Sequence, residues 1–319
     1  MKVLITGGDG FIGVNLIELL LERTDWNIHV LDNFTTSDDG MLERVIGDSK
    51  QVRVFKGDIR EREDIVAAME GCTYVVSLAA QAGVLPSVED PIYDMELNVK
   101  GVINILISAV ELGVKKVVHA SSNALLGEAE LPLSETTLPQ PLAPYGASKL
   151  AGEGYLSAWA ASYGLNTVAL RFSSVYGPKS INKGSAIAKF IKQIMDGDQV
   201  EIWGDGSQTR DLVYVRDIAN AIYLSLVTDL PNKYEMIHIG TGTEITIEEV
   251  FDTIYQKFLD MGYEPKPALH TDWKPGEIRQ NWSSIEKAKK VLGFDPENTF
   301  EENIEETIKW FIENYGEKK

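Results

Sequence analysis

Cysteine is nearly absent from this sequence, and so are long apolar runs. A single thiol, Cys72, cannot form a disulfide within the 319-residue chain, so we expect a reducing, cytoplasmic compartment. No run approaches the roughly 18–20 apolar residues of a membrane helix. The apolar run at the N-terminus is too short for a signal peptide. The four histidines are widely spaced, so we expect no metal site.

Basic residues are outnumbered. The chain has 30 lysines and arginines against 48 aspartates and glutamates, which gives a formal net charge of −18. Nucleic acids and anionic membrane surfaces would be repelled by this charge, so neither is expected as a partner. Apolar residues make up 44% of the chain, an ordinary globular balance. At roughly 100–200 residues per domain, the length predicts two domains or one large elaborated domain.

Short β-rich runs alternate with longer helical patterns in the first half of the chain. The expected strands are 2–6, 27–31, 52–55, 73–78, 114–120 and 166–172, and the expected helices are 10–23, 61–70, 92–112 and 146–163. This alternation predicts an α/β fold, a Rossmann-type doubly wound parallel sheet covered by helices on both faces.

The pattern changes near residue 178. Helical stretches near 184–196, 216–227, 247–261 and 300–315 alternate there with shorter strands and loops rich in glycine and proline. We expect a Rossmann domain over 1–178, to which segments around 211–240 return, and a smaller α+β domain over 179–319. No linker separates the two, so we expect an interface between them, where ligands often bind.

A glycine-rich turn, Thr6–Gly13, follows the first expected strand. Glycines at 7, 10 and 13 permit a tight turn, a close approach of the backbone to a pyrophosphate, and close packing of helix on strand. The next helix offers unpaired N–H groups to phosphates. Asp32 ends the second strand, where a carboxylate accepts hydrogen bonds from ribose hydroxyls and repels a 2′-phosphate. The segment therefore favours NAD over NADP.

Two further strand ends carry weaker signals. Asp58 follows the third strand, where it would either cap the next helix or face the adenine. Ala79 and Ala80 follow the fourth, where small side chains would let a cofactor lie against the backbone, or would serve packing alone.

Tyr145 and Lys149 lie four residues apart and share one face of an expected helix, although a bare pair of this kind could also lie on the surface. A catalytic base at neutral pH needs the tyrosine pKa to fall from about 10 to about 6–7. Lowering the pKa this far requires a favourable interaction with the phenolate. A lysine about 5 Å away supplies roughly 3 kcal/mol of that interaction energy, and an oxidised nicotinamide could supply the rest. Ser122 follows another strand, where it could meet a ligand or cap a turn.

The ordered motifs together resemble the extended short-chain dehydrogenase/reductases, and within them the nucleotide-sugar epimerases and dehydratases, above all the UDP-sugar 4-epimerases. Besides the glycine turn and Tyr145–Lys149, the matching motifs are Asp32-Asn33, Gly57–Ile59, Leu78–Ala80, Ser121-Ser122 with Gly127, Val175–Pro178, Gly204–Gly206 with Arg210-Asp211, and Pro275–Glu277. The resemblance covers nearly the whole chain. It implies a UDP-sugar substrate held by the domain over 179–319, and tightly bound NAD that is recycled.

The resemblance also implies a role for each site residue. Tyr145 would take the proton of the sugar O4 while a hydride passes from C4 to the nicotinamide, and the 4-keto sugar would turn over and take the hydride on its other face. Ser122 would hydrogen-bond O4, and Lys149 would hold the nicotinamide ribose and lower the pKa of Tyr145. The implied cofactor-binding residues are Gly7, Gly10, Phe11, Ile12, Gly13, Asp32, Asn33, Asp58, Ile59, Leu78, Ala79, Ala80, Gln81, Asn98, Tyr145, Lys149 and Phe172. The implied substrate-binding residues are Ser122, Asn123, Tyr145, Ser174, Trp203, Arg210, Lys274, Glu277 and Asn281.

On the substrate side, Trp203 falls where an aromatic ring stacks on uracil, and Arg210 where an arginine binds phosphate. Lys274 and Glu277 fall where residues contact phosphate and ribose. As alternatives, Trp203 could be a core residue and Arg210 with Asp211 a plain surface pair.

Several positions depart from the family pattern. Leu126 replaces an aromatic residue usual near the nicotinamide, and Ser174 replaces an asparagine that contacts a substrate phosphate. Lys274 puts a point charge in place of an arginine fork. Leu85 stands where uronic-acid epimerases often carry an arginine, which argues against a carboxylated sugar. Asn123-Ala124 replaces the acid pair with which 4,6-dehydratases remove water.

Asn281 aligns with a gate of the sugar pocket, where a large tyrosine excludes 2-acetamido sugars. The expected function is therefore a 4-epimerase of UDP-hexoses that accepts UDP-GlcNAc and UDP-GalNAc as well as UDP-Glc and UDP-Gal. The alternatives are a UDP-uronic acid 4-epimerase, another NAD-dependent nucleotide-sugar oxidoreductase or dehydratase, and a non-catalytic nucleotide-binding sensor, against which the Tyr145–Lys149 pair argues. The resemblance also implies a homodimer through a four-helix bundle of 92–112 and 146–163, and both segments carry apolar residues on more than one face.

Overall fold

A seven-stranded parallel sheet forms the centre of the computed structural model, which describes residues 1–36, 40–273, 278–297 and 299–315. Its strands are β1 (Lys2–Thr6), β2 (Asn27–Asp32), β3 (Val52–Lys56), β4 (Tyr74–Ser77), β5 (Lys116–Ser122), β6 (Asn166–Phe172) and β11 (Tyr234–Ile239). Their spatial order is β11-β6-β5-β4-β1-β2-β3, with parallel neighbours throughout. The order reverses between β1 and β4, and ligands of such sheets bind at this switch point, beyond the carboxyl ends of the strands.

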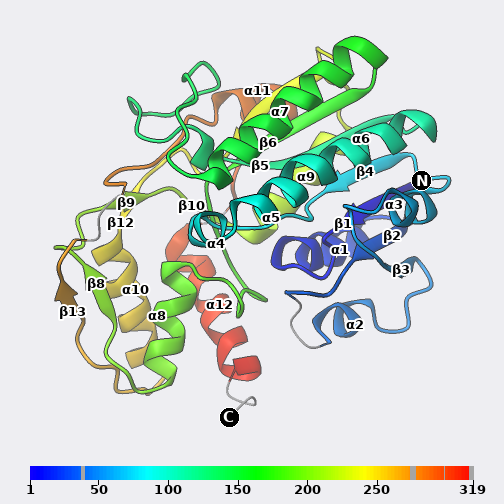
Figure 1. Cartoon of the computed structure of the whole chain (residues 1–319). Coiled ribbons are helices and arrows are strands. Elements are labelled where there is room, and N and C mark those ends of the chain that lie inside the picture. The colour runs from blue at the N-terminus through cyan, green and yellow to red at the C-terminus, as the bar shows by residue number, and fades with distance from the viewer. Residues whose placement is uncertain (37–39, 274–277, 298, 316–319) are drawn as a thin grey trace.

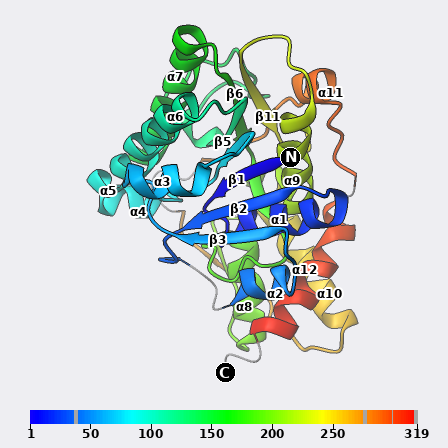
Figure 2. The ribbon, with the colours of Figure 1, turned by 90° about the vertical axis from the view of Figure 1, so that its right-hand side faces the viewer.

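Helices cover both faces of the sheet, which Figure 2 shows nearly edge-on between two helical layers. One layer contains α3 (Arg62–Met69), α6 (Val102–Glu111) and α7 (Pro144–Tyr163); the other contains α1 (Phe11–Arg23), α2 (Met41–Ile46), α9 (Val215–Val227) and α11 (Glu286–Leu292). Alternate residues of a strand point to opposite faces, so Leu4 joins one buried apolar cluster while Val3 and Ile5 join the other. The expected doubly wound α/β fold is confirmed.

A smaller group of elements packs around its own core. It contains α8 (Ala186–Met195), α10 (Ile247–Asp260) and α12 (Phe300–Tyr315), which lie together in Figure 1. Short strands pair beside them: β8 (Glu201–Trp203) with β13 (Leu269–Thr271), β9 (Thr209–Arg210) with β12 (Ile245–Thr246), and β7 (Ser174–Tyr176) with β10 (Leu212–Tyr214). Phe251, Phe258 and Phe311 are among the buried residues of this core.

The chain returns to the large sheet after β10. Helix α9 packs against α1, and β11 then pairs with β6 from Tyr234 to Ile239. Near the end of the chain, α11 packs against β11 and α9 before α12 rejoins the smaller core.

The segment expected to form one helix over 92–112 is helical from Pro91 to Glu111, with one wider turn within it. It consists of α5 (Pro91–Met95), a π-helical turn (Glu96–Gly101) and α6, and the short helix α4 (Val84–Glu89) precedes it. Gly101, the last residue of this turn, packs closely on Ile59, since a Cβ at Gly101 would lie 2.5 Å from the Ile59 Cδ1. Such turns often re-aim a side chain at a functional site, and here the residue carried is Asn98.

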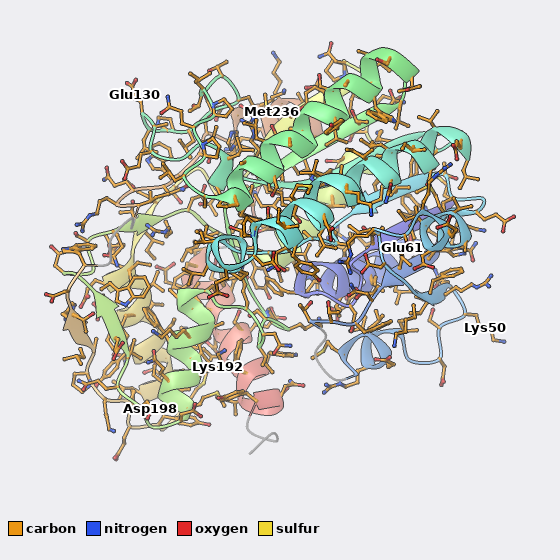
Figure 3. All side chains as sticks on the ribbon, in the orientation of Figure 1. Lys50, Glu61, Glu130, Lys192, Asp198 and Met236 are labelled. Carbon is orange, nitrogen blue, oxygen red and sulfur yellow. The ribbon has the colours of Figure 1, made fainter. Side chains whose placement is uncertain are left out.

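The excess of acidic residues lies in solvent. Glu61, Glu130 and Asp198 are exposed examples that Figure 3 labels around the molecule. Within the described ranges, no helix has the length and apolar character needed to cross a membrane.

Candidate active site

The glycine turn after β1 is packed tightly against the end of β4. Gly7 has a φ of +71°, and a Cβ there would lie 2.6 Å from the Ala79 backbone nitrogen. A Cβ at Gly13 would lie 2.4 Å from the Gly7 oxygen. Neither position has room for a side chain. The Gly10 N-cap makes no side-chain cap to α1, so the turn presents backbone N–H groups, as a phosphate cradle requires.

Asp32 ends β2 beside this turn. Its Oδ2 accepts from the Asp9 N–H at 2.9 Å and its Oδ1 from the Phe34 N–H at 2.9 Å. These two bonds fix the carboxylate at the edge where a nucleotide ribose would lie, and each oxygen keeps a lone pair for a further donor.

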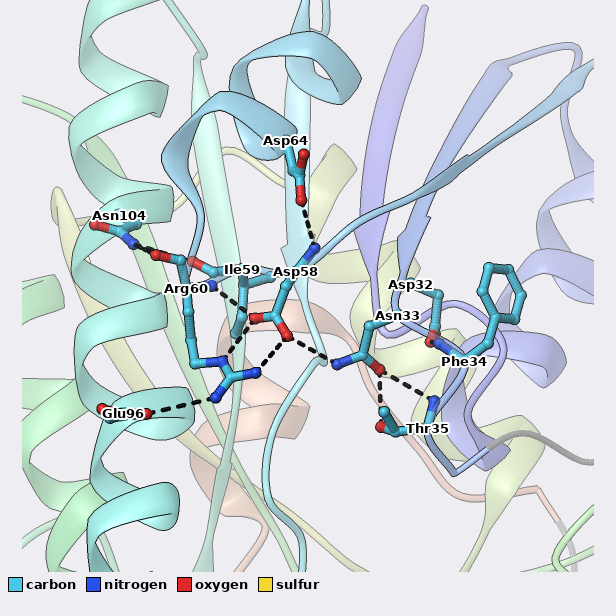
Figure 4. Close-up of polar contacts among 10 residues, drawn as sticks. All are labelled: Asp32, Asn33, Phe34, Thr35, Asp58, Ile59, Arg60, Asp64, Glu96 and Asn104. Atoms are coloured by element: carbon cyan, nitrogen blue, oxygen red, sulfur yellow. Dashed lines mark hydrogen bonds and ion pairs between the residues drawn. The ribbon is translucent and has the colours of Figure 1, made fainter.

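Asp58 and Arg60 form a polar cluster beside the end of β2, drawn in Figure 4. The Arg60 Nη2 lies 2.9 Å from the Asp58 Oδ2, to which the Asn33 Nδ2 also donates at 3.0 Å. Although burial opposes it, hydrogen bonds from Arg60 and Asn33 lower the pKa of Asp58 to about 2. The capping alternative for Asp58 is wrong, because the N-cap of α3 is Glu61. Asp58 instead ties the ends of β2 and β3 together.

Asp58→Asn should destabilise the fold in a pH-dependent way. Because the folded pKa, about 2, lies below the unfolded value of 3.8, the charged carboxylate stabilises the fold above pH 3.8, and this stabilisation is lost as the pH falls towards 2. We expect a loss of roughly 2 kcal/mol at pH 7. Urea unfolding of both proteins at pH 7, 5 and 3.5 measures it. A difference that is the same at all three values would contradict a role for the charge.

Three predicted catalytic side chains meet at the carboxyl end of β5. The Tyr145 and Ser122 hydroxyls share a hydrogen bond. The Lys149 Nζ donates to the Ala120 carbonyl oxygen at 2.8 Å, and Lys149 is only 3% exposed. The surface-pair alternative for Tyr145 and Lys149 is therefore wrong. Pro144 is the first residue of α7, a position that suits proline, so Tyr145 and Lys149 both lie on the first turns of the helix.

The surroundings of this trio oppose ionisation of the tyrosine. Burial raises the pKa of Tyr145, the Ser122 hydrogen bond lowers it, and the Asp94 carboxylate raises it. Burial also lowers the pKa of Lys149 to about 8, against the pull of Asp94 and Glu153. The protein groups alone therefore do not produce a phenolate at neutral pH. This agrees with the inference that the pair can act as a base only beside a cationic cofactor.

Asn98 connects the site to three elements. Its Oδ1 accepts from the Gln81 N–H at 2.9 Å, and its Nδ2 lies 3.0 Å from the Gln81 oxygen. The same Nδ2 lies 2.9 Å from the Asp94 Oδ1 and 3.1 Å from the Ser148 Oγ, which donates to the Tyr145 carbonyl at 3.0 Å. The sequence analysis missed Asp94 and Ser148. Asp94 could have been noticed in the sequence, because it is an acidic residue within an apolar helical pattern.

Asn123 is held by the protein itself. Its Nδ2 donates to Ser173 at 3.0 Å and to Ser283 at 2.7 Å, while its Oδ1 lies 2.8 Å from the His238 Nδ1. Both amide hydrogens are therefore engaged, and Asn123 is 4% exposed. The structure gives this side chain a positioning role; its predicted substrate contact stays a prediction.

Other predicted substrate residues gather near β9. Arg210 donates to the Ile278 carbonyl at 2.9 Å, and the Asn281 carbonyl accepts from the Asp211 N–H at 2.9 Å. Asp211 is 1% exposed and bound to Thr241, so the surface-pair alternative is wrong.

Trp203 ends β8, half-buried, and lies outside the apolar core clusters of the described residues. Ser174 is exposed on β7. Lys274 and Glu277 lie outside the described residues. Among the remaining predicted cofactor residues, Phe172 ends β6 and is 6% exposed, and Leu78 and Ala80 follow β4.

Comparisons with known proteins agree with this arrangement. The NAD dependent epimerase/dehydratase family matches residues 3–240. A Methanocaldococcus jannaschii protein provisionally named a UDP-glucose 4-epimerase is 36% identical over 317 residues, covering 98% of this chain and 99% of its own. UDP-N-acetylglucosamine 4-epimerase from Methanobrevibacter ruminantium M1, solved with UDP-N-acetylmuramic acid, is 32% identical with a TM-score of 0.90 and covers 98% of both chains.

One similar structure contains the cofactor NAD. UDP-glucose 4-epimerase from Thermus thermophilus, solved with NAD, is 34% identical with a TM-score of 0.86, over 98% of this chain and 99% of that one. The glycine turn, which has no room for a side chain at Gly7 or Gly13, and the fixed Asp32 carboxylate fit this dinucleotide. NAD is therefore the cofactor, as the sequence predicted. The chain belongs to the NAD dependent epimerase/dehydratase family.

Proposed function

We propose that this protein is a UDP-sugar 4-epimerase. The observation that carries the proposal is the meeting of Ser122, Tyr145 and the buried Lys149 at the carboxyl end of β5, in a sheet whose switch point holds the NAD turn. Bound NAD supplies a reversible hydride acceptor. The protein then has to remove one proton from the sugar O4 and later return it.

Tyr145 is the group that moves this proton. Its hydroxyl already shares a hydrogen bond with Ser122, which would hold O4 within reach. The Lys149 ammonium, anchored on the Ala120 carbonyl, would favour the phenolate once the cofactor charge is also present. Because the hydride leaves and returns, free NADH does not change, in contrast to a net dehydrogenase or reductase.

Elimination of water is disfavoured at this site. In the sequence, Asn123 and Ala124 replace the acid pair of the dehydratases. Asn123 is also engaged by Ser173, Ser283 and His238. Neither residue can serve as an acid or base for removing a hydroxyl group.

We further propose that the sugar pocket accepts a 2-acetamido group. Asn281 lies beside Asp211 and is smaller than a tyrosine gate. A relative of the same fold is solved with UDP-N-acetylmuramic acid, which also carries a 2-acetamido group. Leu85, 74% exposed on α4, offers no cation for a sugar carboxylate.

A substrate panel tests both statements. The purified protein is incubated with UDP-Glc, UDP-GlcNAc, UDP-GlcA and their C4 epimers, and the products are resolved by chromatography. We expect interconversion of the first two pairs and little of the third. Formation of no epimer from any substrate would reject the proposed function.

The variant Asn281→Tyr tests the specificity of the sugar pocket without changing the residues proposed to act on O4. We expect this variant to keep UDP-Gal turnover and to lose at least about tenfold in kcat/KM for UDP-GalNAc, because the larger ring would occupy the acetamido space. If the wild-type protein converts UDP-Gal but leaves UDP-GalNAc untouched, the proposed acceptance of a 2-acetamido group is contradicted, while the proposed 4-epimerase activity is not.

We also propose a cytoplasmic homodimer formed by α6 and α7. Small exposed residues, Ala147, Gly154 and Ala158, lie along α7 beside the exposed Tyr155, and they would allow another helix to approach closely. Sedimentation velocity at micromolar concentration tests this, and a monomer would reject it.

A further inference from the structure

A segment that begins at the end of the Val175–Pro178 motif lies against α1 and the loop after β2. Residues 178–184, here called the strap, join β7 to α8. At its start, the Pro178 carbonyl accepts from the Asn15 Nδ2 of α1 at 3.2 Å. Further along, the Asn182 Nδ2 lies 3.5 Å from the Thr36 carbonyl oxygen, in the loop after β2. The strap therefore contacts both α1, the helix that follows the dinucleotide turn, and the loop after β2.

Lys183 is the strap residue that points towards the turn. Its Nζ lies 5.1 Å from the centre of the Phe11 ring, and Phe11 is the first residue of α1. The same ammonium donates to the carbonyl oxygen of Val175 in β7. Lys183 thus stands between the N-terminus of α1 and the strand that carries the predicted substrate residue Ser174.

The charge of Lys183 has no partner of opposite charge among the residues that the structure describes. Lys179, on the same strap, pairs with Glu18 at 2.6 Å. Lys183 makes no ion pair with any residue in the described ranges, and burial lowers its pKa to about 8. An ammonium has three donors, and one of them binds Val175. A half-buried cation with spare donors beside a helix N-terminus suits an anion.

We propose that Lys183 binds a diphosphate between the turn and β7. The inference rests on the proposed function, which brings two such groups to the protein: the pyrophosphate of NAD and the diphosphate of the UDP-sugar. The contact with Phe11 points to the first, and the contact with Val175 points to the second. Both have the same chemistry, a doubly charged oxyanion that a cation with free donors stabilises.

Lys183→Met tests the proposal, with Lys183→Arg as the charge-conserving variant and Lys179→Met as the matched control from the strap. NADH binding is measured by fluorescence titration after the bound NAD has been removed, and UDP binding by calorimetry with saturating NAD. We expect Lys183→Met to weaken at least one affinity by roughly tenfold to a hundredfold. Lys183→Arg should restore it to within about threefold, and Lys179→Met should leave both unchanged.

The ligand whose affinity falls in Lys183→Met identifies which diphosphate Lys183 binds. Unchanged affinity of Lys183→Met for both ligands, in a variant whose thermal unfolding matches wild type, would overturn the proposal. Wild-type protein that binds neither NADH nor UDP would instead reject the proposed function and this inference with it. The two failures are distinguishable, because the first is seen only in the variant.

Discussion

Replacing Tyr145 with phenylalanine is expected to lower kcat by about 10²–10⁴-fold, the usual contribution of a positioned general acid–base. The ring would still fill its site at the start of α7, so the fold should survive. The hydroxyl that bonds Ser122, and would exchange the O4 proton, is removed. The loss should fall on kcat, because the phenol hydroxyl acts on the reacting atom rather than on the uridine end.

The measurement is turnover of UDP-Gal together with the NAD content of the purified variant. We expect NAD to remain bound, because the glycine turn and Asp32 are untouched. Tyr163→Phe, near the exposed end of the same helix, is the matched control, since Tyr163 is 60% exposed. Wild-type turnover by Tyr145→Phe would remove Tyr145 as the base.

The largest effect on stability is expected at Glu153. Its Oε1 accepts from the Ser121 hydroxyl at 2.6 Å and from the Arg171 Nε at 2.9 Å, and its Oε2 from the Arg171 Nη2 at 2.7 Å. Both charged side chains are at most 4% exposed. Glu153→Gln would leave the Arg171 cation buried without its counter-charge, and such losses amount to about 3–5 kcal/mol.

Urea unfolding monitored by tryptophan fluorescence measures this loss. The double variant Glu153→Leu with Arg171→Met removes both charges and should regain much of the stability, because it leaves no uncompensated ion. Lys309→Ala, which breaks an exposed i,i+4 pair with Glu305, should leave the unfolding midpoint unchanged. A loss under about 1 kcal/mol for Glu153→Gln would show that the pair is not maintained in solution.

The sheet could be predicted because its strands carry their own local signal. Runs such as Lys2–Thr6 and Asn166–Phe172 are rich in β-formers and bounded by turns, and the structure places strands at both. Tyr145 and Lys149 were found by spacing, since helical geometry alone puts them on one face. The glycine turn was found because steric exclusion at Gly7 and Gly13 leaves a mark in the sequence.

The remaining features depend on contacts that no local pattern records. The wide turn over Glu96–Gly101 has no counterpart in the apolar pattern, and Gly101 there packs on Ile59, which lies far away in the chain. Helices α2, α4 and α11 are too short for a recognisable apolar period. The position of Lys183 depends on how the strap lies over α1, and a single lysine in a loop predicts nothing by itself.

The route of the chain links the two parts of the molecule. The backbone passes between the large sheet and the smaller core after Tyr176, Tyr214 and Ile239, before Glu286, and after Leu292. A fragment ending near the strap would lack β11, the neighbour of β6, so it could not form the complete large sheet. Because the chain crosses between the two cores several times, each core is built from segments that lie far apart in the sequence.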